Sequence, residues 1–170
     1  MVDATYLTAL RALVMRLEQT DVMWALTGSL AFALQGVPAE PHDIDVQTDA
    51  AGAYAIEQCF AAHVTRPVTW ATAAQIHSHF GALTLGGLRV EIMGGLQKRR
   101  TNGTWEPPVD VERHRRFIAV ADLRVPVLSL EHEYQAYLLL DRREKAEVLR
   151  AWLQRTRAAG DVHAATEVPD

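Results

Sequence analysis

The sequence predicts an α/β (α+β) domain in which helices flank one mixed β-sheet. Over the first 63 residues, apolar side chains recur alternately at helical and at strand spacing. From residue 80 to residue 130, strand-like segments predominate, and a long helical pattern follows them. This mixed order of elements is typical of a single mixed sheet. With 170 residues, of which 49% are hydrophobic, the chain is long enough to bury one core.

The N-terminal elements alternate between helix and strand. Residues 4–19 carry apolar side chains at helical spacing, and Asp3 suits the N-cap of that helix. Residues 22–28 are a short apolar run that ends in glycine and predicts a buried strand. A short helix is predicted directly after it, over residues 29–35, and Gly36 suits its C-terminal end.

A second strand and helix follow a loop with two prolines over residues 37–42. Residues 43–49 alternate in character and predict a strand. Residues 51–63 predict a helix from the spacing of their alanines with Ile56 and Phe60.

The second half begins with a clear hairpin over residues 80–95. Its two strands, in which apolar and polar residues alternate, flank Gly86–Gly87, a favoured two-residue turn. No element is predicted for residues 64–79, which precede the hairpin. A polar loop follows over residues 98–108, and two short strands are predicted over residues 115–120 and 124–130. Residues 131–157 then predict a helical segment, which Asp141 can interrupt. We therefore expect an α/β domain over residues 1–128 and a C-terminal helical segment over residues 129–157 that belongs to the same compact unit. Residues 158–170 are expected to form a flexible tail.

Composition excludes several classes of protein. A single cysteine, Cys59, rules out a disulfide framework and a zinc site built mainly on cysteines. No apolar run approaches the ~18 residues of a membrane span, and Asp3 and Glu18 are unlike a signal peptide. We therefore expect a cytoplasmic protein that does not enter a membrane.

The net charge of −4 hides an uneven distribution. Residues 1–88 contain 3 basic and 8 acidic residues, whereas residues 89–157 contain 14 basic and 10 acidic residues, and most of these cations are arginines. Arginine favours bidentate contacts with phosphate. Ordinary solvated faces are an alternative explanation of these arginines, but a polyanionic substrate such as RNA stays open.

Three acidic residues fall where a strand pattern predicts a common open face. Asp43 and Asp45 are two positions apart, so both project from the same side of their strand while Ile44 points into the core. Glu91 lies between core-facing residues in the second arm of the hairpin. Carboxylates gathered on one face repel one another unless a cation joins them, and Mg²⁺ prefers such hard oxygen ligands. Three acids from two strands can hold two metal ions about 3.5–4 Å apart, as phosphoryl transfer requires.

Gly28 and Ser29 supply the complementary feature at the junction of strand and helix. Glycine lets a phosphate approach the backbone closely, and Ser29 offers a hydroxyl group at the start of a helix, where an anion is favoured. N-capping of the helix is an alternative role that Ser29 can fill at the same time. A glycine–serine turn beside a pair of metal-binding acids predicts a site for a nucleoside triphosphate.

The segment TGSLAFALQGVPAEPHDIDV resembles the signature of the DNA polymerase β-like nucleotidyltransferase superfamily. That signature is Gly-Ser or Gly-Gly, about a dozen residues, and Asp-x-Asp among apolar neighbours, with a third acid on a later strand, here Glu91. Small minimal members are most similar, including AbiEii-type toxins and the aminoglycoside and lincosamide adenylyltransferases. The resemblance covers roughly residues 20–95 and implies a nucleotidyltransferase-like mixed sheet. The helices around DRREKAEVL are more loosely similar to the C-terminal appendage of such proteins.

The resemblance implies a magnesium-dependent nucleotidyltransferase. Asp43 and Asp45 would bind Mg²⁺ (two ions, or Mn²⁺), and Glu91 would bind the second ion or deprotonate the acceptor. Gly28 and Ser29 would hold the β- and γ-phosphates, with Lys145 as a further phosphate contact. An acceptor hydroxyl on a small molecule, an RNA end or a protein side chain would attack the α-phosphate of the nucleoside triphosphate and release pyrophosphate.

Two other functions stay open at this point. Glu40, close to the acid pair where many small members carry arginine and threonine, favours a non-catalytic binding module or a protein of a toxin–antitoxin pair. The same acid cluster would also suit a metal-dependent phosphodiesterase. His77 and His79 lack the further ligands of a zinc site, and Trp105 is expected to pack over its loop.

Overall fold

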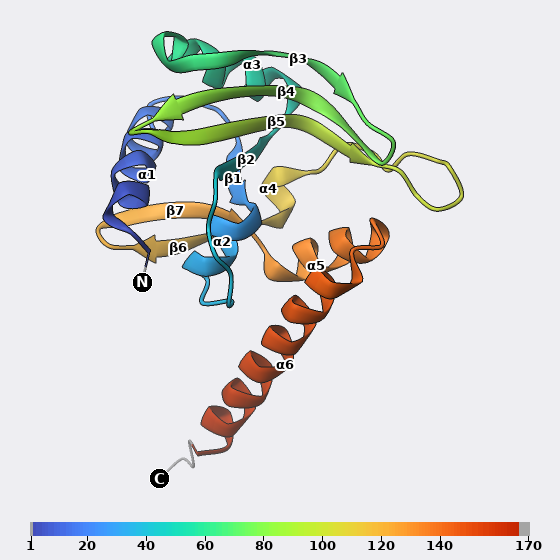
Figure 1. The fold of residues 1–170 in the computed structure, drawn as a ribbon. Helices are drawn as coiled ribbons and strands as arrows, with labels where there is room; N and C mark the ends of the chain where they lie inside the picture. The colour runs from blue at the N-terminus through green and yellow to red at the C-terminus, as the bar shows by residue number, and fades with distance from the viewer. Residues whose placement is uncertain (1, 167–170) are drawn as a thin grey trace.

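The computed structural model describes residues 2–166, with side chains as far as residue 160, and its centre is one seven-stranded sheet (Figure 1). The strands lie in the order β3-β4-β5-β2-β1-β7-β6. Strands β2 and β5 are parallel, as are β1 and β7, and the other neighbours are antiparallel, so the predicted mixed sheet is confirmed. The strands are β1 (Trp24–Thr27), β2 (Ile44–Thr48), β3 (Val64–Thr72), β4 (Ile76–Leu85), β5 (Leu88–Lys98), β6 (Arg115–Val120) and β7 (Leu123–Leu128).

Helices flank this sheet in the order the sequence predicts, and the largest core cluster lies between α1, α3 and one face of the sheet. Leu10 of α1 and Ile56 of α3 are fully buried there, against Ile44 and Val46 of β2. A smaller cluster places α4 against β1 on the opposite face. The helices are α1 (Ala4–Leu17), α2 (Gly28–Leu34), α3 (Ala50–Cys59), the 3-10 turn η1 (Ala61–His63), α4 (Val111–His114), α5 (Leu130–Leu139) and α6 (Arg143–Thr166).

Several local signals have the predicted structural consequence. The Asp3 carboxylate accepts a hydrogen bond from the Thr5 amide at 2.7 Å, which caps α1. Gly86 and Gly87 have φ values of +56° and +81°, the left-handed conformation that a two-residue hairpin turn requires. The predicted hairpin of β4 and β5 is therefore confirmed.

The edge strand β3 is the main element that the sequence does not predict. Most of its side chains are exposed, so the strand lacks a regular alternation of buried and exposed residues. Pro67 also lies within it, and two shifts of register interrupt its pairing with β4. Proline is tolerated in a sheet mainly at an edge, where its missing amide needs no partner.

Two predicted helix boundaries also differ. The helix expected over residues 51–63 ends at Cys59, and a separate 3-10 turn follows Phe60. Helix α6 continues to Thr166, beyond the predicted end at residue 157, because its alanine-rich sequence favours helix and only Gly160 opposes it. The end of the predicted tail, residues 167–170, lies outside the described residues.

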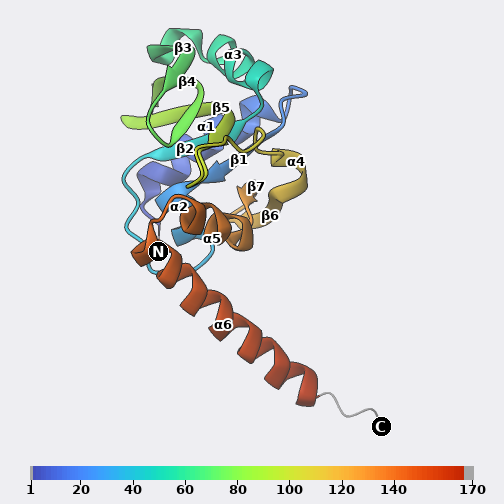
Figure 2. The ribbon, with the colours of Figure 1, turned by 90° about the vertical axis from the view of Figure 1, so that its right-hand side faces the viewer.

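The C-terminal helices α5 and α6 form an angled pair, in which α5 lies against the body of the molecule and α6 extends away from it (Figures 1 and 2). Asp141 interrupts them as predicted, with a φ of +54° between α5 and α6. Buried Leu130 and Leu149 pack with Phe32 of α2 in a second core cluster, which attaches both helices beside α2. Among the described residues, no helix is both long and apolar enough to cross a membrane.

Candidate active site

A row of three polar residues crosses three neighbouring strands near the start of α2. Asp45 of β2 lies opposite Thr27 of antiparallel β1 and opposite Glu91 of parallel β5. Side chains of residues paired in this way point to the same face of a sheet. The structure therefore brings the predicted acids Asp45 and Glu91 together, on the face opposite the α1–α3 core.

Asp43 lies one step outside the strand, at the end of a loop that α1 holds in place. The Tyr6 hydroxyl lies 2.9 Å from the Pro41 carbonyl oxygen and 3.1 Å from that of His42, to which it donates hydrogen bonds. The Asp43 charge helps to raise the pKa of Tyr6, after burial, so the two side chains are close enough to interact. This anchoring fixes the chain immediately before the acid pair.

Gly28 is the point where β1 turns into α2, and its conformation favours glycine. Its φ is +73°, in the left-handed region. A Cβ atom built on Gly28 would overlap Asp45 Oδ2, because the distance between the two atoms would be well below 3.0 Å, the shortest that real Cβ atoms show to a neighbouring atom. The backbone of this turn is thus in direct contact with the central carboxylate of the row.

Ser29 lies next to this turn, but it does not cap α2. The N-cap is Thr27, and it makes no side-chain capping hydrogen bond, because its hydroxyl is used elsewhere. Ser29 Oγ instead accepts a hydrogen bond from the His42 amide at 3.4 Å. The capping role considered for Ser29 is wrong, and its hydroxyl proton is left available to donate to another group.

The carboxylate of Asp45, at the centre of the row, has too little positive charge around it to stay fully ionised. Burial, then the charges of Glu91 and Asp43, and hydrogen bonding to Glu91 raise the pKa of Asp45 to about 7. The Lys145 charge opposes this shift. A cation between these carboxylates would reverse the balance and keep Asp45 ionised.

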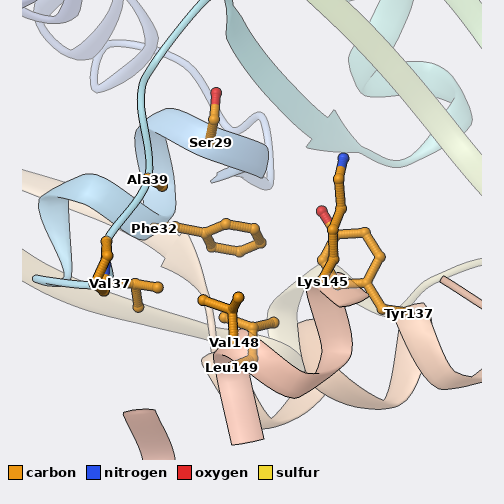
Figure 3. A pocket seen from close by; sticks show the side chains of 9 residues that line it. Ser29, Phe32, Val37, Ala39, Tyr137, Lys145, Val148 and Leu149 are labelled. Carbon is orange, nitrogen blue, oxygen red and sulfur yellow. The ribbon is translucent and has the colours of Figure 1, made fainter. Parts of the chain in front are cut away.

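Lys145 of α6 lies beside Ser29 at a small, mostly apolar cavity of about 160 Å³ (Figure 3). Figure 3 shows Ser29 and the Lys145 ammonium group toward one edge of this cavity, with Val148 toward the opposite edge. The Lys145 ammonium lies 5.6 Å from the centre of the Tyr137 ring. Lys145 and Ser29 thus line one cavity, and the three acids do not line it, so the role of Lys145 as a phosphate contact stays a prediction.

Glu133 of α5 is a site residue that the sequence analysis missed. It is 4% exposed, and its carboxylate accepts a hydrogen bond from the Thr27 hydroxyl. Burial raises the pKa of Glu133 to about 7, against the Thr27 hydrogen bond, the Lys98 charge and the Gly28 amide. Glu133 lies three positions after Leu130 and four before Tyr137, so it shares the helical face of two core residues, and this acidic residue at a core position is the signal that could have found it.

Arg89 is a second missed residue. It lies two positions before Glu91 on β5, on the same face, and its Nε donates to Glu91 Oε1 at 3.0 Å. The pair is partly exposed, so it contributes little to stability. Its place at the edge of the acid row makes Arg89 a cation available to an anionic substrate.

The acids suit a hard divalent cation by their chemistry, since they offer carboxylate oxygens and lack sufficient positive charge around Asp45. Within the described residues, no three His, Cys, Asp or Glu side chains are close enough to hold a metal ion as they stand. Asp45 and Glu91 are the two acids that the sheet register brings together. His77 and His79 belong instead to an aromatic cluster with Trp70 and Trp105. In this cluster the rings of His77 and Trp105 stack, with their centres 3.7 Å apart.

Comparison with known proteins shows the family and the fold. The family model described as aminoglycoside-2''-adenylyltransferase matches residues 9–152. A solved structure from Thermotoga maritima, described as that of a candidate nucleotidyltransferase, is 52% identical with a TM-score of 0.80. The alignment covers 91% of this chain and 96% of that one. No curated protein matches significantly.

Two further solved structures share the fold. The antibiotic-resistance factor ANT(2'')-Ia is 17% identical with a TM-score of 0.51, over 96% of this chain and 99% of that one. The lincomycin-bound lincosamide adenylyltransferase LnuA is 16% identical with a TM-score of 0.52, over 84% and 94%. The expected toxin–antitoxin partner stays a prediction. Because the family model matches most of the chain, the protein belongs to the aminoglycoside-2''-adenylyltransferase family of small nucleotidyltransferases.

Proposed function

We propose that this protein moves a nucleoside monophosphate from a nucleoside triphosphate to a hydroxyl group of a small molecule, with magnesium as the metal. The observation that carries the proposal is the row of Thr27, Asp45 and Glu91 beside the Gly28 turn. The family description makes ATP the first donor to test and an aminoglycoside the first acceptor.

The triphosphate would bind beside the Gly28 turn, where the Ser29 hydroxyl has a proton to donate. The Asp45 carboxylate fills the space next to the Gly28 backbone, so the metal on that carboxylate would be close to the phosphates. Lys145 supplies a positive charge beside Ser29. A divalent cation held by Asp43 and Asp45 would neutralise charge on the phosphates and stabilise the transition state.

Glu91 is the residue that we assign to the acceptor. Its carboxylate is partly exposed and lies directly opposite Asp45, so an acceptor hydroxyl can reach it while the α-phosphate lies nearby. Glu91 takes the proton as the acceptor oxygen bonds to the α-phosphorus. The bond from the α-phosphorus to the bridging oxygen breaks at the same time, and pyrophosphate leaves with the electron pair.

The experiment is transfer of label from α-³²P ATP, GTP, CTP or UTP to a panel of acceptors, with Mg²⁺, Mn²⁺ or EDTA. The panel contains an aminoglycoside, a lincosamide, an RNA oligonucleotide and the protein itself. We expect metal-dependent label on one small molecule and none with the Asp43→Asn/Asp45→Asn double variant. Hydrolysis of the nucleotide without any acceptor, or equal transfer by the double variant, would contradict the proposal.

A further inference from the structure

A second cavity, of about 290 Å³, lies between the loop before α4, α4 itself and α5. We name it the Lys98 cavity, after the residue at the end of β5 that lines it. It shares no lining residue with the cavity of Ser29 and Lys145. Nothing in the proposed nucleotidyl transfer uses it.

Lys98 is unusual for a lysine, because it is only 7% exposed. Over residues 2–160, no hydrogen bond and no ion pair within 4.0 Å involves its ammonium group. Glu133 and Glu106 are near enough to favour the charged form, but burial is stronger and lowers the pKa of Lys98. Among the described residues, Lys98 Nζ is not one of the fully buried atoms that lack a partner, so it keeps some contact with the open space of the cavity. An anion in that space can supply the partner that the ammonium lacks.

Two imidazole rings lie in the same cavity wall. His114 and His132 stack with their ring centres 4.2 Å apart. Burial lowers the pKa of His132 to about 4 and also lowers that of His114, so both rings are neutral near pH 7. Within the part of the chain that has described side chains, neither ring makes a hydrogen bond, and each neutral ring has one N–H to donate.

The acidic residues of the cavity, in contrast, already have partners. Glu106 accepts two hydrogen bonds from the Arg100 guanidinium group, at 3.0 and 2.7 Å. The Asp110 carboxylate accepts the Arg113 amide at 3.1 Å and caps α4. The donors of Lys98 and the two rings are therefore unused, whereas Glu106 is paired with Arg100 and Asp110 uses its Oδ1 to cap α4.

We infer that the Lys98 cavity binds a small oxyanion, a phosphate or carboxylate group, through Lys98 and the His114–His132 pair. The exposed Arg113 and Gln135 at its rim add further donors for the same anion. This site is separate from the nucleotidyl-transfer site and does not depend on the function proposed there. Glu133 is the one residue near both, since it bonds Thr27 and senses the Lys98 charge.

The test is a titration of the full chain with inorganic phosphate and, separately, with acetate, followed by NMR of the histidine rings. We expect saturable shifts of His114 and His132, with little shift of His42, which lies beside Ser29. Shifts with phosphate alone identify a phosphate-bearing ligand, and shifts with acetate as well identify a carboxylate-bearing one. No shift at either ring with either anion would overturn the inference.

Lys98→Met and Lys145→Met are a matched pair, because these are the two lysines of the chain. A charge-assisted hydrogen bond is worth enough that Lys98→Met should weaken phosphate binding about tenfold or more. Lys145→Met should leave it within about twofold, since Lys145 lines the other cavity. The reverse pattern would place the anion at the nucleotide site and overturn the inference.

A second pair of variants covers the case in which Lys98→Met does not fold. Gln135 is exposed at the rim, so its replacement leaves the core intact. Gln135→Glu should weaken phosphate binding, and Gln135→Lys should strengthen it, each by about threefold for a partly screened charge. Equal affinities in these two variants would contradict an anion in this cavity.

Discussion

Asp45 and Glu91 occupy directly opposite positions on the parallel strands β2 and β5. The two carboxylates come from residues 46 positions apart, yet the sheet register holds them side by side on one face. Burial and this neighbour raise the pKa of Asp45 to about 7. A pair of like charges kept together at this energetic disadvantage is typical of a functional site.

Replacement of Gly28 by alanine should disrupt both the turn and the acid row. Alanine must adopt a φ of +73° there, and its Cβ overlaps Asp45 Oδ2. We expect a loss of well over 1 kcal/mol in the free energy of unfolding, measured by urea denaturation. Gly86→Ala is the matched control, because Gly86 also has positive φ but nothing lies within 4 Å of its Cβ position. Equal losses in the two variants would argue against the contact with Asp45.

Glu133→Gln should make the protein more stable at alkaline pH. Burial raises the pKa of Glu133 from 4.5 to about 7, so its stabilising contribution is present below pH 4.5 and is lost as the pH rises through 7. Glutamine stays neutral and can still accept from the Thr27 hydroxyl. The stability advantage of the variant should therefore grow by on the order of 2 kcal/mol between pH 5 and pH 8.

Urea unfolding at these two pH values measures that difference. The Asp45 charge also acts on Glu133, so the measured difference includes the loss of this coupling in the variant. Glu131→Gln is the control, because Glu131 is exposed on the same helix, two positions earlier. A Glu133→Gln advantage that is the same at pH 5 and pH 8 would contradict a protonated, buried carboxyl group.

Lys145→Met should weaken binding of the nucleoside triphosphate. The residue is exposed at the start of α6, so the fold should tolerate the change. Loss of one charge-assisted phosphate contact should raise KM for the nucleotide about tenfold or more. Lys145→Arg should retain most of the affinity. A normal KM for Lys145→Met would remove this residue from the nucleotide site.

Ala121→Gly should stabilise the protein. Ala121 has a φ of +53° in the turn between β6 and β7, where glycine has no steric cost. We expect a gain of about 0.5–1 kcal/mol, as a rise in the midpoint of thermal unfolding. Ala119→Gly, at an exposed position within β6, should instead destabilise the strand. A destabilised Ala121→Gly protein would contradict the left-handed turn.

The sequence predicts the pair of Asp45 and Glu91 from local rules and one long-range contact. The two-residue period of a strand aims Asp45 away from the core, and the Gly86–Gly87 turn fixes the hairpin that carries Glu91. Asp43 precedes β2, so its role beside Asp45 stays a prediction. The meeting of Asp45 and Glu91 requires β2 and β5 to be neighbours. That pairing is a long-range feature, which the resemblance to a known family supplies and the periodicity alone does not.

Features that depend on tertiary packing are the ones the sequence misses. Glu133 lies in a helix whose other buried side chain, Leu130, is apolar, and its partner Thr27 is 106 positions away. Strand β3 is an edge strand without alternating burial, so it has no period to detect. Lys98 likewise ends a strand, and only the packing of α5 over it creates the cavity.

The most direct test of the active-site assignment measures the release of pyrophosphate from ATP in the presence of an acceptor that the enzyme uses. The test compares two aspartate variants, one within β2 and one directly after it. Asp45→Asn removes the central carboxylate, and Asp49→Asn changes an exposed residue that caps α3 through Gly52. We predict that Asp45→Asn loses activity by about 100-fold or more, while Asp49→Asn stays within about twofold of the wild type. Activity of Asp45→Asn equal to that of Asp49→Asn would contradict an active site at the acid row.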